Sequence, residues 1–188
     1  MSNLRVLVPP VSSDLATGVL TGGPVSEDVR TIRDLKGVFF DENARSERSQ
    51  DEVVYRVLSY QPVPQGTSGG LFFGTTFVSP GSVGEECFMT KGHFHAKAEA
   101  SEYYWGVLGE GLLLLMDRDR SLKVEKVARG SVHFIPAFTA HRLVNTGAET
   151  LAVGACWPAD AGHDYEAIAR DGFGVRVLKG QVLREEGR

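Results

Sequence analysis

Only two of the 188 residues are cysteines, Cys87 and Cys156, so the chain lacks the disulfide framework that stabilises many small secreted domains. Long apolar runs are also missing. The early run Val6–Val8 stops at Pro9 and Pro10, and it is too short for a signal-peptide core or a membrane span. We therefore expect two reduced, partly buried thiols, a cytoplasmic protein and no membrane partner.

A strong excess of charge of either sign is absent as well. Lysines and arginines number 20 against 24 aspartates and glutamates, which gives a formal net charge of -4. This balance gives no reason to expect nucleic acid as a partner, although local donors can still bind an anionic substrate. With 42% hydrophobic and 23% charged residues, the composition is that of one globular domain with a sizeable core.

The pattern from residue 53 onward predicts an all-β domain. Segments rich in β-branched and aromatic residues alternate with turns of glycine, proline and aspartate. The predicted strands are 53–60, 71–79, 85–95, 102–108, 112–116, 123–127, 131–135, 141–145 and 151–157. Many short strands at regular spacing are typical of a sandwich or a barrel.

Two or three helical segments are predicted outside the strands. Residues 26–36 combine an N-cap serine, an acidic first turn and apolar residues at helical spacing, and they end before Gly37. Residues 41–52 are charged and predict a solvated loop or a short exposed helix. Asp164 can cap a last short helix that runs to residue 170.

These segments divide the chain into three parts. Residues 1–50 predict an N-terminal arm and a helix that packs on the β-domain, and the first 25 of them predict short extended pieces. Residues 51–178 form the β-domain, and residues 179–188 form a C-terminal tail.

The strongest chemical signal is the pair His93 and His95. In a strand, side chains two residues apart lie on one face, about 6.5 Å apart along the backbone. Glu102 and His141 would complete a site of three imidazoles and one carboxylate. Such a donor set suits a transition metal better than calcium. Glu99 is the rival carboxylate, but it lies in a turn-like segment, whereas Glu102 opens an apolar strand.

The spacing around these residues resembles the two motifs of the cupin superfamily, whose members hold a metal in a small, jelly-roll-like β-barrel. The first block comprises Gly92, His93, His95, Glu102, Gly109 and Gly111, and the second comprises Gly130, Pro136, His141 and Asn145. One departure is Phe138, at a position where many cupins have glycine. His133 lies outside both motifs, and we interpret it as a packing or surface histidine.

Flanking motifs narrow the resemblance to one family. The run Pro158-Ala159-Asp160-Ala161-Gly162-His163-Asp164-Tyr165, together with Thr90 to Lys97 and Ala140 to Asn145, is similar to the cupin-type glucose-6-phosphate isomerases, best known from archaea. The similarity extends over roughly residues 26–178, which is most of the chain.

This resemblance implies a site and its partners. The metal ligands would be His93, His95, Glu102 and His141, which hold one divalent transition metal per chain. Iron is favoured, with manganese, nickel, zinc and cobalt as alternatives. The sugar phosphate would contact Thr76, Thr90, Lys91, Gly92, Tyr104, Trp157, His163 and Tyr165. Trp157 stands where the family often has tyrosine. The family is typically a homodimer that uses its N-terminal strands.

The implied reaction interconverts glucose 6-phosphate and fructose 6-phosphate by moving a hydrogen between C1 and C2. One route passes through a cis-enediol, with Glu102 as the base and with His163 and Tyr165 assisting ring opening. The other is a metal-assisted hydride shift that needs no protein base. The sequence leaves both routes open.

Three alternative functions also remain open. The first is an isomerase or epimerase that acts on another sugar phosphate, such as mannose 6-phosphate. The second is a metal-dependent oxygenase that uses the same ligands, and the third is a sugar-phosphate-binding module without catalysis.

Overall fold

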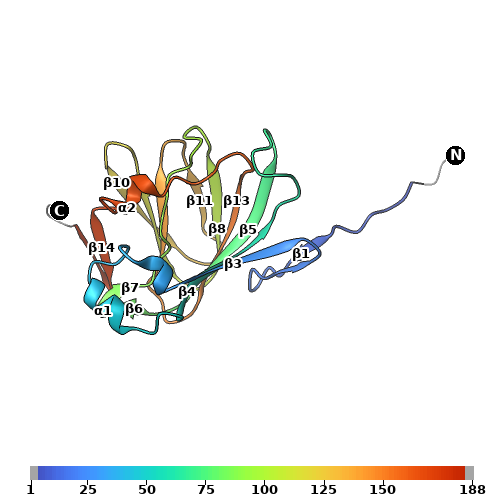
Figure 1. Cartoon of the computed structure of the whole chain (residues 1–188). Coiled ribbons are helices and arrows are strands. Elements are labelled where there is room, and N and C mark those ends of the chain that lie inside the picture. Colours follow the sequence, from blue (N-terminus) through green and yellow to red (C-terminus); the bar gives the residue numbers. More distant parts are fainter. Residues whose placement is uncertain (1–3, 185–188) are drawn as a thin grey trace.

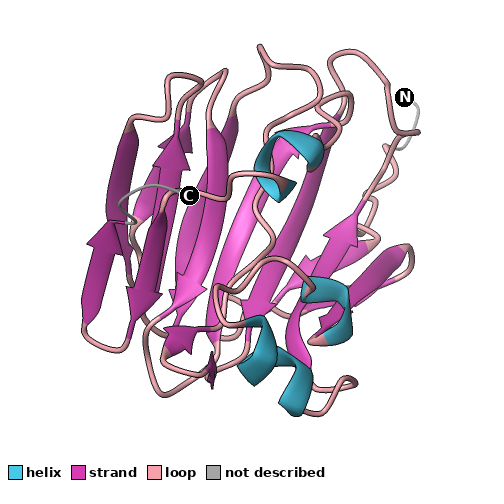
Figure 2. Ribbon diagram, turned by 60° about the vertical axis from the view of Figure 1, so that its left-hand side comes forward, coloured by secondary structure: helices cyan, strands magenta, loops and turns pink. Residues whose placement is uncertain are grey.

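The computed structural model describes residues 4–184, and strands dominate it (Figures 1 and 2). The strands are β1 Val11–Ser13, β2 Leu20–Gly22, β3 Val25–Thr31, β4 Val53–Tyr60, β5 Leu71–Val78, β6 Ser82–Val83, β7 Glu86–Cys87, β8 Glu102–Leu108, β9 Gly111–Met116, β10 Leu122–Val127, β11 Val132–Ile135, β12 Ala140–Asn145, β13 Leu151–Pro158, β14 Val175–Leu178 and β15 Gln181–Arg184. The helices are short: the 3₁₀ turn η1 Arg33–Leu35, α1 Glu42–Glu47 and α2 Glu166–Ala169.

Antiparallel sheets face one another around a common core. The largest sheet has six strands in the order β11-β8-β13-β5-β4-β3, and the sheet β10-β9-β12 packs against it through the shared core. A four-stranded sheet, β15-β14-β7-β6, covers one end. The all-β prediction is thus confirmed, with the jelly-roll-like cupin arrangement. The predicted tail 179–188 contributes β15, and its last four residues lie outside the described part of the chain.

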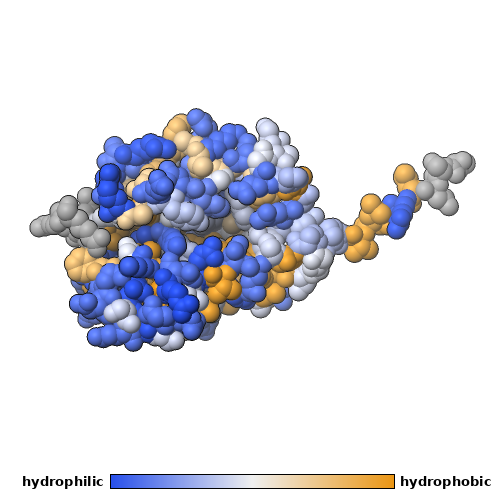
Figure 3. All heavy atoms as spheres, in the orientation of Figure 1, coloured by the Kyte–Doolittle hydropathy of each residue, from blue (hydrophilic) through white to orange (hydrophobic). Residues whose placement is uncertain are grey.

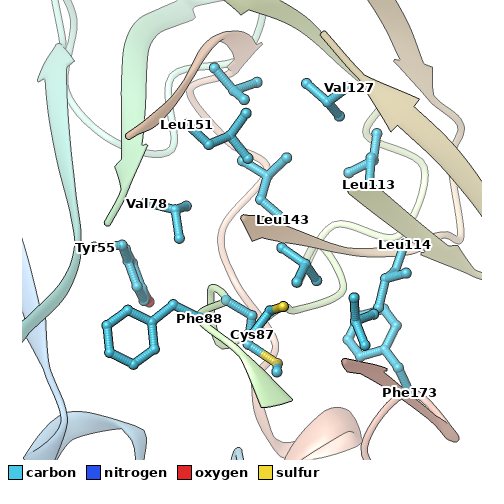
Figure 4. Close-up of a cluster of buried hydrophobic side chains, with 14 of the residues drawn as sticks. Tyr55, Val78, Cys87, Phe88, Leu113, Leu114, Val127, Leu143, Leu151 and Phe173 are labelled. Atoms are coloured by element: carbon cyan, nitrogen blue, oxygen red, sulfur yellow. The ribbon is translucent and has the colours of Figure 1, made fainter. Parts of the chain in front are cut away.

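Apolar side chains from both facing sheets fill the space between them (Figure 4). Leu113 of β9, Leu143 of β12 and Leu151 of β13 are each at most 2% exposed. A smaller cluster lies on the outer face of the six-stranded sheet, where Leu20 of the β1–β2 hairpin packs with Phe77 and other residues. The hairpin therefore covers part of a face that would otherwise be open to water.

The helix predicted over residues 26–36 is wrong. Residues 25–31 form β3, an edge strand that pairs with β4, and only the η1 turn that follows is helical. Ile32 and Leu35 are buried as their spacing suggested, but Val29 is 40% exposed. Pairing with β4 satisfies the backbone groups of β3 that face that strand, and this tertiary gain outweighs the local helix signals.

The other local predictions hold more closely. A short helix forms within residues 41–52, where the Asp41 carboxylate accepts a hydrogen bond from Ala44 N at 2.9 Å. A short helix, α2, also forms after Asp164, but its N-cap is Tyr165 and not Asp164. The Asp164 carboxylate lies one residue earlier and accepts a hydrogen bond from Glu166 N at 3.1 Å. Phe138 takes the left-handed conformation that glycine usually supplies, with φ of 64°.

The cysteines and the apolar content of the helices can be compared with what the composition predicts. Cys87 and Cys156 are both free, one buried and one half-buried, as predicted. No helix within residues 4–184 has the length and apolar character needed to cross a bilayer.

Truncating a side chain of the main core should destabilise the fold. Leu113 is 0% exposed, so Leu113→Ala removes packed methyl groups and leaves a cavity, at a cost of about 2–5 kcal/mol. Leu15 is 87% exposed, and Leu15→Ala should change stability by less than about 0.5 kcal/mol. Urea unfolding followed by circular dichroism measures both effects, and equal midpoints for the two variants would contradict this core assignment.

Candidate metal centre and substrate cavity

Three histidines and one glutamate converge from separate segments. Glu102 is the first residue of β8 and His141 the second of β12. His93 forms an isolated antiparallel bridge with His141, with N···O distances of 3.3 and 3.0 Å in the two directions. This pairing holds the His93–His95 segment against β12, so that the two neighbouring imidazoles meet the third.

The four side chains form one compact group. One ring nitrogen from each of His93, His95 and His141 lies within 4.8 Å of the others. Glu102 Oε2 lies 3.2 Å from His95 Nε2 and 3.4 Å from His141 Nε2. Glu102 is 5% exposed, whereas its rival Glu99 is exposed to solvent. The structure therefore brings together the four predicted ligands and leaves Glu99 outside.

Hydrogen bonds and burial set the protonation of this group. His95 Nδ1 lies 3.0 Å from the Ala100 carbonyl, to which it donates, so that Nε2 faces Glu102. Burial, strengthened by the neighbouring histidines, lowers the pKa of His93 well below its usual value and keeps that imidazole neutral. Burial alone would raise the pKa of Glu102, but His141 and His95 outweigh it and hold that pKa below its usual value. Burial alone would lower the pKa of His95, but its contacts with Glu102 and Ala100 outweigh burial and raise it. The centre thus combines a neutral His93 with a charged carboxylate.

The residues fit a divalent transition metal. Both ring nitrogens of His141 are buried, and neither has a hydrogen-bond partner among the described residues. Leaving such atoms unpaired is costly unless another group binds them. Three imidazoles and one carboxylate are a donor set that iron, manganese, nickel and zinc accept.

A cavity of about 110 Å³, called the inner cavity below, opens beside this centre. It is lined by Tyr55, Val57, Gly74, Thr75, Thr76, Thr90, Gly92, His93, His95, Glu102, Tyr104, His141, Leu143, Ala155, Trp157, His163 and Tyr165. All the predicted site residues except Lys91 are among them. Residues as far apart in the chain as 55 and 165 thus share one space.

Aromatic side chains surround the metal ligands within the inner cavity. The His163 ring lies 4.4 Å from that of His93, centroid to centroid, and stacks on Tyr165 at 5.6 Å. Burial lowers the pKa of His163 and raises that of Tyr165, so both side chains are neutral near pH 7. Burial, together with Glu102, raises the pKa of Tyr104 well above its usual value. These groups can donate and accept hydrogen bonds without adding charge.

Another wall of the inner cavity offers small hydrogen-bond donors. The Thr90 hydroxyl oxygen accepts from Leu143 N at 3.1 Å, which leaves its own hydrogen available. Gly92 has φ of +71°, and a Cβ there would lie 2.6 Å from the Phe173 ring. Only glycine fits this position without displacing Phe173. The rings of Trp157 and Phe72 pack edge to face, with centroids 5.9 Å apart.

Lys91, the remaining predicted contact, is oriented differently. Its side chain lines a neighbouring cavity of about 160 Å³, together with Arg142 and Phe173. Its carbonyl accepts a hydrogen bond from Arg142 Nη2 at 2.6 Å. Thr90 thus lines the inner cavity, Lys91 lines the neighbouring one, and Gly92 lies at the border of both.

His133 and Tyr55 are two further buried residues, and the sequence indicated the role of only the first. His133 is a buried packing histidine, as interpreted: its ring nitrogens lie 2.7 Å from Glu125 Oε2 and 2.8 Å from Ser131 Oγ. Tyr55 of β4 also lines the inner cavity, although no motif in the sequence marks it. Burial, with a smaller contribution from Tyr165, raises its pKa to about 12. The alternating pattern of residues 53–60 indicates that Tyr55 and Val57 share one face of a strand. It does not indicate that this face lies beside the predicted ligands.

Solved structures similar to this chain include cupin enzymes. Oxalate decarboxylase from Bacillus subtilis at pH 4.6 aligns with a TM-score of 0.46 and 18% identity, over 58% of this chain and 26% of the decarboxylase. A formate complex of the Lactobacillus farciminis enzyme gives a TM-score of 0.46 and 18% identity, over 59% of this chain and 30% of that enzyme. This chain therefore spans between a quarter and a third of their length.

Sequence comparison reaches much closer relatives. A glucose-6-phosphate isomerase from Thermococcus onnurineus is 43% identical over 170 residues, which cover 90% of this chain and 88% of the relative. One from Pyrococcus furiosus is 42% identical over 171 residues, with the same coverage, and one from Sinorhizobium medicae is 40% identical over 167 residues, 87% and 76% of the two chains. The family model described as glucose-6-phosphate isomerase (GPI) matches residues 29–186. The chain therefore belongs to the cupin-type glucose-6-phosphate isomerase family.

Proposed function

We propose that this protein interconverts glucose 6-phosphate and fructose 6-phosphate with the help of one divalent metal, iron being our first choice. One observation carries the proposal: a single cavity combines the four-residue ligand set with His163, Tyr165 and the donors around Thr90. We also propose the cytoplasm as its location, which agrees with the free thiols of Cys87 and Cys156.

We assign the metal to His93, His95, Glu102 and His141. When bound there, it would act as a Lewis acid that polarises the substrate carbonyl. The protein supports this by holding the His95 tautomer through Ala100 and by keeping Glu102 charged. Burial of the group excludes water from the reacting carbons.

The remaining residues divide the work of binding and proton transfer. Glu102 is our proposed base, which removes a proton from one of the two reacting carbons and returns it to the other through a cis-enediol. Tyr104 would donate a hydrogen bond to a sugar oxygen, and His163 with Tyr165 would assist ring opening. The donors of Thr76, Thr90 and Gly92 would hold the phosphate, and Trp157 would close the cavity wall beside them.

A dimer is part of the proposal. The N-terminal arm extends away from the β-domain and carries apolar side chains in water (Figures 1 and 3). Leu4, Val6 and Val8 are each at least 89% exposed, and Leu7 is 71% exposed. Exposed apolar residues in such a run favour contact with a second copy of the chain.

The test of the function is conversion of fructose 6-phosphate to glucose 6-phosphate. Chelation should abolish activity, and reloading with iron, manganese, nickel or zinc should restore it, because the ligands alone do not polarise the carbonyl. His141→Ala should lose metal and activity together, while His133→Asn keeps both. Folded, metal-loaded protein without turnover would refute the proposal and direct the work to mannose 6-phosphate and then to oxygen uptake.

The role of Glu102 as the base can be examined separately. Glu102→Gln should lower kcat by about 10²–10⁴, the usual contribution of general base catalysis. The exposed Glu99→Gln serves as the matched control and should be unchanged. Metal content per chain separates loss of the base from loss of the ligand. Isomerisation in deuterated water should introduce deuterium at the reacting carbon, and its complete absence would favour a hydride shift between C1 and C2.

The proposed dimer predicts a change in mass when the arm is altered. Wild-type protein should sediment as a dimer, and the double substitution Val6→Asp with Val8→Asp should shift it toward monomer, because charged side chains would resist burial. Leu15 is also exposed but lies in the β1–β2 hairpin, outside the apolar run of residues 4–8, so Leu15→Asp is a suitable comparison. Sedimentation of wild-type protein as a monomer at micromolar concentration would count against the dimer.

A further inference from the structure

The inner cavity is too small to hold a whole hexose phosphate. It has a volume of about 110 Å³, whereas sites for small molecules usually span roughly 300–1,000 Å³. A second cavity of about 400 Å³, called the outer cavity below, shares Tyr55, Val57, Trp157, His163 and Tyr165 with it. If C1 and C2 lie at the metal ligands, as the proposed function requires, the rest of the substrate extends toward this outer cavity.

Strand β3 forms the rim of the outer cavity. Its register pairs Arg30 with Tyr55 and Asp28 with Val57 across the β3–β4 ladder. Directly paired residues of antiparallel strands project from the same face of the sheet. Tyr55 and Val57 line the inner cavity, and Asp28 and Arg30 line the outer one. The register therefore directs Arg30 toward the substrate side of the sheet.

The other face of the same strand pair provides a contrast. Arg56 pairs with Val29, and its guanidinium lies 4.2 Å from the centre of the Phe77 ring on the outer face of the sheet. Its side chain is 35% exposed and Arg30's is 37%, so the two arginines differ in direction and not in exposure. Arg56 also forms an ion pair with Glu27 at 3.0 Å.

Positive charge is scarce around the two cavities. Among the described residues, Arg30 is the one lysine or arginine that lines either cavity, while Glu102 and Asp28 are acidic. A phosphate monoester carries close to two negative charges at pH 7, and its oxygens match the donors of a guanidinium. Arg30 also lowers the pKa of Tyr55 and of Tyr165 against the larger effect of burial, so its charge is felt within the site.

The Asp34 carboxylate, whose pKa is lowered mainly by hydrogen bonds from Thr31 and to a smaller extent by Arg30, lies near Arg30, but the direct contacts of Arg30 are weak. Its Nη1 donates to the carbonyl of the adjacent Val29 at 3.0 Å and lies 3.9 Å from Asp28 Oδ1. Both contacts are short-range and near solvent, where an ion pair contributes little. The guanidinium can therefore turn toward an anion that enters the outer cavity.

We propose that Arg30 is the counter-ion of the substrate phosphate, binding it at the junction of the outer and inner cavities. Thr76, Thr90 and Gly92 supply neutral hydrogen bonds, and Arg30 supplies the charge that lets the enzyme select phosphorylated sugars. Asp28 holds the guanidinium at the rim before substrate arrives and competes with the phosphate for it.

Steady-state kinetics with fructose 6-phosphate tests this role. Arg30→Gln should raise KM by roughly 10- to 100-fold, the usual effect of losing a hydrogen bond to a charged group. The value of kcat should change by less than about threefold, because binding energy used equally in the ground and transition states affects KM alone. Arg30→Lys should lie in between, and Arg56→Gln should match wild type.

Binding of inorganic phosphate gives a readout that does not need turnover. Trp157 lines both cavities, so phosphate titration can be followed by tryptophan fluorescence and by competitive inhibition. Arg30→Gln should weaken phosphate binding by the same factor as it raises KM, and Asp28→Asn should strengthen binding several-fold by removing the competing carboxylate.

The outcomes separate this inference from the proposed function. If Arg30→Gln and Arg56→Gln behave alike in both assays, or if Asp28→Asn weakens phosphate binding, the role of Arg30 is overturned while the isomerase proposal stands. A lack of turnover by metal-loaded wild-type protein would overturn the proposed function. The phosphate titration would still show whether Arg30 binds the anion. Should Arg30→Gln fail to fold, Arg30→Lys and Asp28→Asn carry the same test.

Discussion

A buried carboxylate surrounded by imidazoles is the interaction on which the rest of this protein depends. Glu102 lies 3.2 Å from His95 and 3.4 Å from His141, and it is almost fully removed from water. Burial of a charge is costly unless partners compensate for it. The antiparallel bridge between His93 and His141 and the position of Glu102 at the start of β8 serve this compensation. They also create the open donor set that suits a metal.

Neutral hydrogen-bonding groups and positively charged groups lie in different parts of the cavity walls around this centre. Besides the carboxylate of Glu102, the inner cavity is lined by threonines, phenols and imidazoles, all of which can form hydrogen bonds. Gly92 lets the wall approach Phe173 closely, and Arg142 holds the adjacent Lys91 carbonyl in place. Among the described residues, the one lysine or arginine that lines either cavity is Arg30 on the edge strand. The histidine–carboxylate group and this positive charge therefore come from different parts of the fold.

Much of the centre could be predicted from local sequence. The alternation of β8 places Glu102 and Tyr104 inside and Tyr103 outside, because strand side chains alternate between faces. The short strands and their turns followed from β-branched residues, glycine and proline. His133 was separated from the metal ligands because it falls outside both motifs. The flanking motifs, above all residues 158–165, also identified the family, which the sequence comparisons confirm.

By itself, the sequence determined which side chains share a strand face, because that depends only on a period of two. The tertiary structure decided which faces meet. It turned residues 25–31 into an edge strand where helix signals were present, since pairing with β4 satisfies backbone groups that local propensity cannot. That pairing set Arg30 opposite Tyr55, and the path of residues 90–93 placed Lys91 beside the neighbouring cavity and not the inner one. Contacts between segments more than twenty residues apart leave no local pattern, so only the folded chain specifies them.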